Sequence, residues 1–110
     1  MRLLIYYLDD EYLNCDLFKD CYESDEVEVK TFLDPIEAIE ETKKVKPDLF
    51  FIDFRLPKIN GEEVAKLTDP SIKKILITGE LNVSPVYDFL KIFYKPYKPS
   101  SVGEFIKTFL

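Results

Sequence analysis

The stretch that decides the fold is Leu3-Leu4-Ile5-Tyr6-Tyr7-Leu8-Asp9-Asp10, a largely apolar run closed by two acids. An apolar run of this length is expected of a β-strand covered on both faces, as in the middle of a parallel sheet. Three later runs end in the same way: LFFI before Asp53, ILI before Thr78 and IFY before Lys95. Because parallel strands end at the same edge of a sheet, we predict that these five polar residues converge in one acidic pocket.

Strand-like and helix-like segments alternate along the chain. The expected strands are Leu3–Leu8, Glu26–Phe32, Leu49–Ile52, Lys73–Thr78 and Ile92–Lys95. The expected helices run from the acids at 9–11 to about Tyr22, from Pro35 after the cap Asp34 to about Val45, from Gly61 to about Leu67, near Pro85–Leu90, and over about Ser101–Leu110. This alternation predicts one α/β domain over residues 1–110, a five-stranded parallel sheet with right-handed crossovers and five helices on its two faces.

Apolar residues at helical spacing indicate which helix faces are buried. In the first helix we expect Leu13, Leu17, Phe18 and Cys21 to face inward, and in the second Ile36, Ile39 and Val45. Cys15 and Cys21 lie six residues apart in one helix, about 9 Å along its axis, which is too far for a disulfide. We expect both to be buried thiols of a cytosolic protein.

Composition narrows the possible functions. The chain has 110 residues, a net charge of -6 and no histidine, and its bases form no block. Direct binding to nucleic acid is therefore not expected, since phosphates require a clustered positive surface. The absence of histidine excludes Ser-His-Asp and Cys-His catalysis and every His-ligated metal site. No signal peptide and no stretch of about 20 apolar residues is present, so we predict a cytoplasmic protein without membrane insertion.

The predicted pocket has the chemistry of phosphoryl transfer. Crowded carboxylates repel by about 4 kcal/mol per pair at 4 Å and an effective dielectric near 20, so positive charge must offset them. Lys95 supplies one charge, and Mg2+, which prefers oxygen ligands, is the natural partner for the rest. Asp53 can act as a nucleophile that forms an acyl phosphate. Thr78 and Lys95 can then bind phosphoryl oxygens, while Asp9 and Asp10 hold the metal.

The order Asp9-Asp10, then Asp53-Phe54-Arg55-Leu56-Pro57 with Gly61, then Thr78, then Lys95-Pro96 resembles the receiver domain of two-component response regulators. The resemblance covers the whole chain and implies a flavodoxin-like, doubly wound sheet of order 2-1-3-4-5. It implies that Asp53 accepts a phosphoryl group from the phosphohistidine of a sensor histidine kinase or a histidine phosphotransfer protein. Such a protein catalyses its own phosphorylation and dephosphorylation and is not a conventional enzyme.

The same resemblance assigns roles to individual residues. Asp10, Asp53 and the backbone carbonyl of Arg55 would ligate Mg2+ directly, with Asp9 acting largely through water. Lys95-Pro96 would be a cis peptide. The side chains of Arg55 and Glu80 would tune how fast the acyl phosphate hydrolyses.

The chain also departs from the family pattern. The segments from Asp53 to Thr78 and from Thr78 to Lys95 are shorter than usual, so we expect the third and fourth helices to be truncated. Ile92 stands where the family commonly has a Tyr or Phe switch residue. Tyr94 has the same strand parity and either substitutes for it or simply packs. No output domain follows Leu110, so we expect a stand-alone receiver that relays phosphate or docks on a downstream protein when phosphorylated.

Three other functions fit the residues less well. A haloacid-dehalogenase phosphatase also uses an Asp nucleophile with Mg2+, but it requires an Asp two residues later, where this chain has Arg55. A flavin site would require Gly, Ser and Thr after the first strand, in place of Asp-Asp-Glu. The alternative kept open is a receiver-like module that binds a protein partner without phosphorylation, which the short helices and Ile92 favour.

Overall fold

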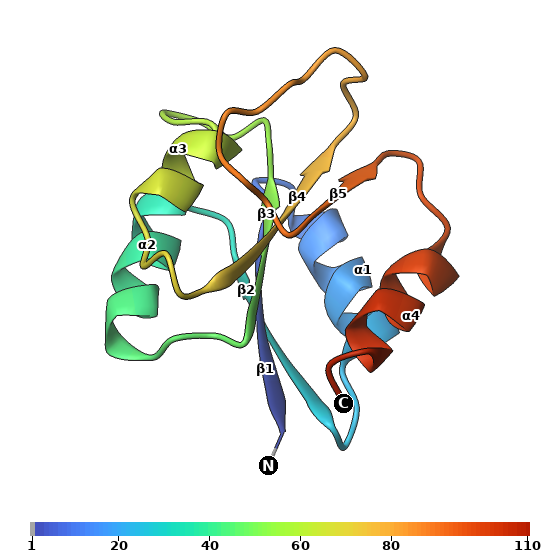
Figure 1. Ribbon diagram of the computed structural model, residues 1–110. Coiled ribbons are helices and arrows are strands. Elements are labelled where there is room, and N and C mark those ends of the chain that lie inside the picture. Colours follow the sequence, from blue (N-terminus) through green and yellow to red (C-terminus); the bar gives the residue numbers. More distant parts are fainter. Residues whose placement is uncertain (1) are drawn as a thin grey trace.

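The computed structural model describes residues 2–110, which fold around a five-stranded parallel sheet (Figure 1). The strands are β1 (Leu3–Leu8), β2 (Val27–Phe32), β3 (Leu49–Asp53), β4 (Lys73–Thr78) and β5 (Lys91–Tyr94). Their order is β2-β1-β3-β4-β5, and every neighbouring pair is parallel. The predicted fold class and strand order are therefore confirmed.

Four helices cover the two faces of this sheet within the described residues. They are α1 (Tyr12–Tyr22), α2 (Pro35–Lys44), α3 (Gly61–Lys66) and α4 (Pro99–Lys107). In Figure 1, α1 and α4 lie on one side of the sheet and α2 and α3 on the other. In residues 2–110, none of these helices is long and apolar enough to cross a membrane.

The central strands are buried on both faces, which explains their nearly continuous apolar sequence. Successive residues of a strand point to opposite faces, so the core divides into two clusters. From β1 and β3, the cluster beside α1 and α4 receives Ile5, Tyr7, Leu49 and Phe51, and the cluster beside α2 and α3 receives Tyr6, Leu8, Phe50 and Ile52. The first cluster therefore lies on the same face as Asp9, which has the strand parity of Tyr7.

The expectation of five helices is wrong in one place: none of the described residues between β4 and β5 forms a helix. The segment predicted as helical, Pro85–Leu90, is too short to nucleate a helix without packing to support it. The buried ammonium of Lys74 in β4 holds this segment instead. Its Nζ donates to the hydroxyl of Tyr87 at 2.8 Å and to the backbone oxygens of Asp69 and Thr68 at 2.8 and 3.3 Å. The expected truncation of α3 is confirmed, since it has six residues.

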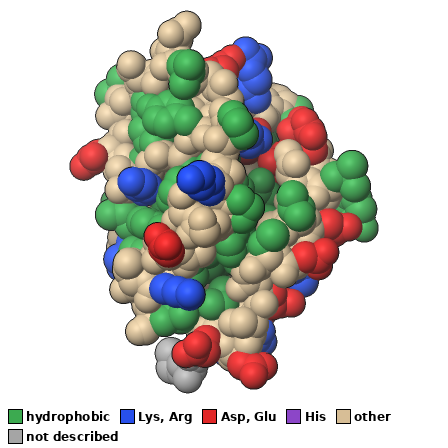
Figure 2. Space-filling view, turned by 90° about the vertical axis from the view of Figure 1, so that its right-hand side faces the viewer, with side chains coloured by type: hydrophobic (Ala, Val, Ile, Leu, Met, Phe, Trp, Pro, Cys, Tyr) green, Lys and Arg blue, Asp and Glu red, His purple; other side chains and the backbone are tan. Residues whose placement is uncertain are grey.

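Exposed apolar side chains occur in the segment between β4 and β5 and at the end of β5. Leu81, Val86, Leu90 and Tyr94 are all exposed. Figure 2 views the molecule from the side of β5 and α4 and shows hydrophobic side chains on the surface among basic and acidic ones. Exposed apolar surface of this kind is suited to protein contacts.

Two helices are rotated relative to the sequence expectation. In α1 Phe18 is buried as expected and Cys15 is buried beside it, whereas Leu13 and Leu17 are 76% and 62% exposed. The Phe18 ring stacks on Tyr7 of β1, with centroids 4.1 Å apart, and this contact decides which face of α1 turns inward. Cys21 is consequently exposed, contrary to the expectation of two buried thiols. In α2, Ile39 is buried as expected, but Ile36 and Val45, the residue that follows the helix, are exposed.

Candidate functional site

Acidic side chains from two strand ends meet one lysine at the carboxyl edge of the sheet. Carboxylate oxygens of Asp9, Asp10 and Asp53 all lie within 4.8 Å of one another. The Lys95 Nζ lies 2.9 Å from Asp53 Oδ1 and 3.8 Å from Asp9 Oδ2. The parallel pairing of β1 with β3, β3 with β4 and β4 with β5 brings these chain segments to one place.

Asp9 is fully buried and is the most extensively bonded of the three acids. Its Oδ1 accepts from the backbone N–H of Glu11 at 2.9 Å. Its Oδ2 accepts from the Tyr7 hydroxyl at 2.9 Å and from the Asn14 amide at 3.1 Å. Asp10, in contrast, is exposed and borders a surface depression lined by Phe54, Arg55, Leu56, Pro57 and Asn60. A ligand that approaches through this depression therefore meets Asp10 before the buried Asp9.

Burial and crowding make the ionised form of Asp53 unfavourable. Desolvation is the largest cause that raises the pKa of Asp53, to about 6, and the charges of Asp9 and Asp10 add to it. The hydrogen bond from Lys95 opposes this rise without cancelling it. Burial lowers the pKa of Lys95, but its bond to Asp53 and the charges of Asp53 and Asp9 outweigh burial, and the net direction is upward. The cluster has more negative charge than Lys95 offsets, and its all-oxygen donor set fits Mg2+.

The loop after Asp53 is held close to the site by a glycine. A Cβ on Gly61 would lie 2.6 Å from the backbone oxygen of Asp53 and 3.0 Å from the Cα of Phe54, so a larger residue does not fit. The Gly61 N–H donates to the Phe54 carbonyl at 2.8 Å. Asn60 and Glu63 form a capping box that starts α3. These contacts close the loop that carries the Arg55 carbonyl.

The residues expected to modulate the site differ in their surroundings. Thr78 is buried at the end of β4, and its Oγ accepts from the Glu80 N–H at 3.0 Å. The Glu80 carboxylate forms an ion pair with Arg55. Ile92 is half-buried against the α2 and α3 cluster, and Tyr94 is 42% exposed. The Lys95-Pro96 peptide is cis, as the resemblance implied.

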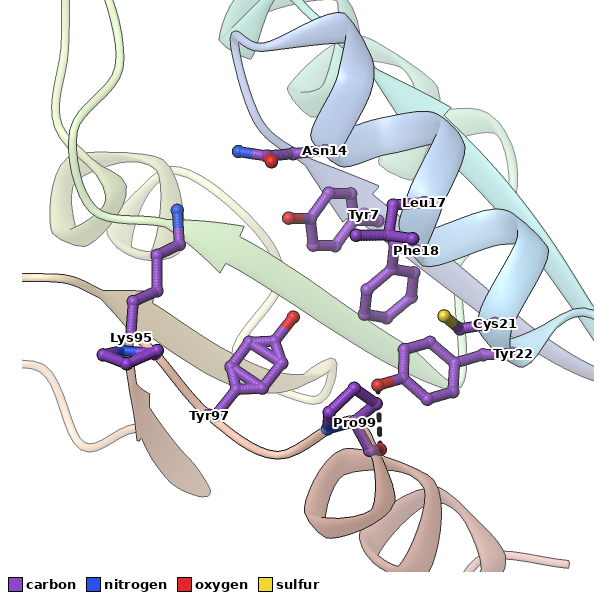
Figure 3. A pocket seen from close by; sticks show the side chains of 10 residues that line it. Tyr7, Asn14, Leu17, Phe18, Cys21, Tyr22, Lys95, Tyr97 and Pro99 are labelled. Carbon is purple, nitrogen blue, oxygen red and sulfur yellow. Dashed lines mark hydrogen bonds between the residues drawn. The ribbon is translucent and has the colours of Figure 1, made fainter.

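Tyr7 and Asn14 are site residues that the sequence analysis missed. The signal for Tyr7 was present, because residues two apart in a strand share a face and Tyr7 precedes Asp9 by two. Asn14 comes from α1, and its approach to Asp9 depends on how that helix packs. Both line a groove of about 350 Å³ between α1 and the segment after β5 (Figure 3). Lys95 and Tyr97 border the same groove.

A five-stranded sheet of this order with an acidic cluster and a lysine at its carboxyl edge is the architecture of a receiver domain. The sequence profile described as "Response regulator receiver domain" matches residues 5–99, and the chain belongs to this family.

Curated relatives are response regulators of several kinds. The polar-differentiation response regulator DivK of Brucella anthropi is 34% identical over 59 residues, 54% of this chain and 48% of DivK. The chemotaxis protein CheY of Thermotoga maritima is 32% identical over 77 residues, 62% of this chain and 63% of CheY. The sporulation initiation phosphotransferase F of Bacillus subtilis is 25% identical over 118 residues, 100% of this chain and 95% of the relative. This chain thus spans about half of DivK and less than two thirds of CheY in these matches.

Solved structures agree with the family assignment. A CheY-like receiver domain protein from Methanospirillum hungatei has a TM-score of 0.85 at 25% identity, covering 98% of this chain and 93% of that one. A CheY-like receiver domain from Methylobacillus flagellatus has a TM-score of 0.85 at 18% identity, with both chains covered completely. The second similarity concerns the fold alone.

Proposed function

We propose that this receiver accepts a phosphoryl group on Asp53 from a phosphohistidine of a sensor histidine kinase or a histidine phosphotransfer protein, in a Mg2+-dependent reaction. It would signal through phosphorylation-dependent binding to a downstream protein or through a phosphorelay. Family membership supports this proposal, as does the similarity to the sporulation initiation phosphotransferase F of Bacillus subtilis. A cytoplasmic location stays a prediction of the sequence.

The observation that carries the proposal is the Asp53 carboxylate paired with Lys95 at the carboxyl edge of the sheet. An Asp53 carboxylate oxygen attacks phosphorus, and the phosphorus–nitrogen bond of the phosphohistidine breaks with its electron pair left on the ring nitrogen. The reaction requires the ionised carboxylate, which predominates above a pKa of about 6. Lys95 donates to an oxygen of the transferred group, where a fixed positive charge stabilises phosphoryl transfer.

The acidic cluster is the proposed place for Mg2+. Asp10 and Asp53 would ligate the ion directly, together with the backbone carbonyl of Arg55, and Asp9 would contribute largely through water. Bound Mg2+ supplies positive charge that offsets the repulsion among the carboxylates and the incoming phosphoryl oxygens. This chain's part is to hold the ligands: the hydrogen bonds of Asp9 and the Gly61 contact keep β1 and the loop after Asp53 in place.

We propose that phosphorylation shifts a two-state equilibrium in residues 79–90. The Thr78 hydroxyl now accepts from the Glu80 N–H, and it would donate its own proton to a phosphoryl oxygen on Asp53, which would draw Thr78 toward the site. Movement of Thr78 would release Glu80, whose carboxylate pairs with Arg55. Amide NMR spectra with and without a phosphoryl mimic and Mg2+ test this step, and unchanged signals in residues 79–90 would refute it.

The phosphoacceptor itself is tested by intact mass. The protein is incubated with Mg2+ and a small acyl-phosphate donor, and we expect one added phosphoryl group that is absent from Asp53→Asn. Turnover of the donor without a lasting adduct would indicate a phosphatase. No adduct and no turnover under any condition would reject the proposal and leave a receiver-like protein that binds its partner without phosphorylation.

A further inference from the structure

Three donor groups from three parts of the fold lie near one carboxylate oxygen of Asp9. Asp9 Oδ2 accepts from the Tyr7 hydroxyl of β1 at 2.9 Å and from the Asn14 amide of α1 at 3.1 Å. The Lys95 ammonium, just beyond β5, lies 3.8 Å from the same oxygen. Figure 3 shows Tyr7 and Asn14 approaching from one side of the groove and Lys95 rising opposite them.

A carboxylate oxygen has two lone-pair directions for strong hydrogen bonds. Tyr7 and Asn14 occupy this capacity on Asp9 Oδ2, and at 3.8 Å the lysine is outside hydrogen-bonding distance. Lys95 instead donates to Asp53 Oδ1 at 2.9 Å. The ammonium has three N–H donors, yet of these two carboxylates only Asp53 lies within hydrogen-bonding distance, and the donors on Asp9 keep the lysine on the Asp53 side.

We propose that Tyr7 is a positioning residue that directs Lys95 to the phosphoacceptor, acting through Asp9. This inference rests on the proposed function, because it assigns Lys95 to the phosphoryl oxygens on Asp53. Without the Tyr7 hydroxyl, Asp9 Oδ2 gains a free lone pair, Lys95 moves toward it, and the transferred group loses part of its charged partner.

The setting of Tyr7 makes it a rigid donor. Its side chain is 2% exposed, and its ring stacks on Phe18 with an interplanar angle of 15°. Burial, followed by the charge of Asp9, raises the pKa of Tyr7, so the hydroxyl keeps its proton. The stacking depends on the ring and not on the hydroxyl, so Tyr7→Phe removes one hydrogen bond and leaves the packing intact.

The chain offers a matched control one residue away. Tyr6 is equally buried in β1 but points to the opposite face of the sheet, where its hydroxyl donates to the Val45 carbonyl at 3.0 Å. Tyr6→Phe therefore makes the same chemical change in the same strand, away from Asp9 and Lys95. Thermal unfolding of both variants checks that they lose comparable stability.

The first measurement is the rate of phosphorylation by an acyl-phosphate donor at saturating Mg2+. We expect Tyr7→Phe to slow it by about twofold to tenfold, the range that one net hydrogen bond supports, and Tyr6→Phe to leave it within about twofold. In a Lys95→Ala background, Tyr7→Phe should have no further effect, because the two residues act through one contact. A Tyr7→Phe rate equal to the wild type, or losses that multiply in the double variant, would overturn the proposal.

The second measurement does not depend on phosphorylation. The Lys95 ammonium signal in 15N–1H spectra, assigned by its loss in Lys95→Arg, should shift in Tyr7→Phe and stay unchanged in Tyr6→Phe. An unchanged signal in Tyr7→Phe overturns the positioning role. If the wild type forms no adduct while the signal shifts, the proposed function fails and the Tyr7 contact with Asp9 and Lys95 stands.

Discussion

Replacing Asp53 with asparagine should stabilise the protein relative to wild type by an amount that grows with pH. The folded-state pKa of Asp53 is about 6, raised from an ordinary value of 3.8 chiefly by burial. A carboxyl group with a raised pKa in the folded state holds its proton where the unfolded chain has released it. Its neutral form therefore supports the fold at low pH, and this stability is lost as the pH rises from about 3.8 through 6.

The magnitude follows from the two pKa values. Each pKa unit corresponds to about 1.4 kcal/mol, so the whole shift costs the wild type about 3 kcal/mol at pH 8. At pH 5 Asp53 is still largely protonated in the folded state, and about half of that loss has occurred. Asp53→Asn does not titrate at this position. The difference in unfolding free energy between the variant and the wild type should therefore increase by about 1.5 kcal/mol from pH 5 to pH 8.

Urea unfolding followed by circular dichroism measures this difference, with EDTA present to remove divalent ions. A difference that stays constant or narrows between pH 5 and pH 8 would refute the conclusion that burial and acidic neighbours raise the pKa of Asp53. Mg2+ provides the complementary test at pH 8. It should stabilise the wild type by about 1.4 kcal/mol for each tenfold excess over its dissociation constant, and Asp53→Asn by less.

Three further predictions concern the fold around the site. Gly61→Ala places a Cβ 2.6 Å from the Asp53 backbone oxygen, and urea unfolding should show a loss of about 2–3 kcal/mol; a loss below about 0.5 kcal/mol would contradict the close approach. Lys74→Met removes three hydrogen bonds, so hydrogen exchange should become faster at the amides of residues 85–90 and stay unchanged in β1, whereas uniform acceleration would indicate global destabilisation instead. Leu17→Ser on the exposed face of α1 should change stability by no more than about 0.5 kcal/mol, whereas Phe18→Ala should cost about 3–5 kcal/mol, and similar losses would contradict the observed rotation of α1.

The strands were predictable because their signals are local, whereas their order was implied by the resemblance to receiver domains. A run such as Leu49–Ile52 is apolar throughout, and a short run of this kind is typical of a strand in the middle of a parallel sheet. The polar residue that ends each run is then carried to the common edge by topology alone. Asp9, Asp10, Asp53 and Lys95 could therefore be named as neighbours before any distance was known.

The errors share one physical cause. The local pattern of apolar and polar residues does not show which side chains of other elements pack against a segment. Leu13 and Leu17 have the right spacing for a buried stripe, but the stacking of Phe18 on Tyr7 turns them to solvent. Pro85–Leu90 could have been helical by composition, yet the buried Lys74 binds Tyr87 and holds the segment in an irregular path. Whether a lysine in a strand is buried depends on hydrogen-bond acceptors that lie far away in the sequence or across a turn.

The sequence by itself determined the class of fold, the edge at which the chemistry lies, and the residue types available there. These depend on the two-residue period of strands and on the parallel arrangement, both of which are properties of short segments. Only the tertiary structure decided which donor binds which carboxylate. Tyr7 and Asn14 donate to Asp9, and Lys95 donates to Asp53. That choice depends on differences of about 1 Å between groups from β1, α1 and the segment after β5, and packing alone sets such distances.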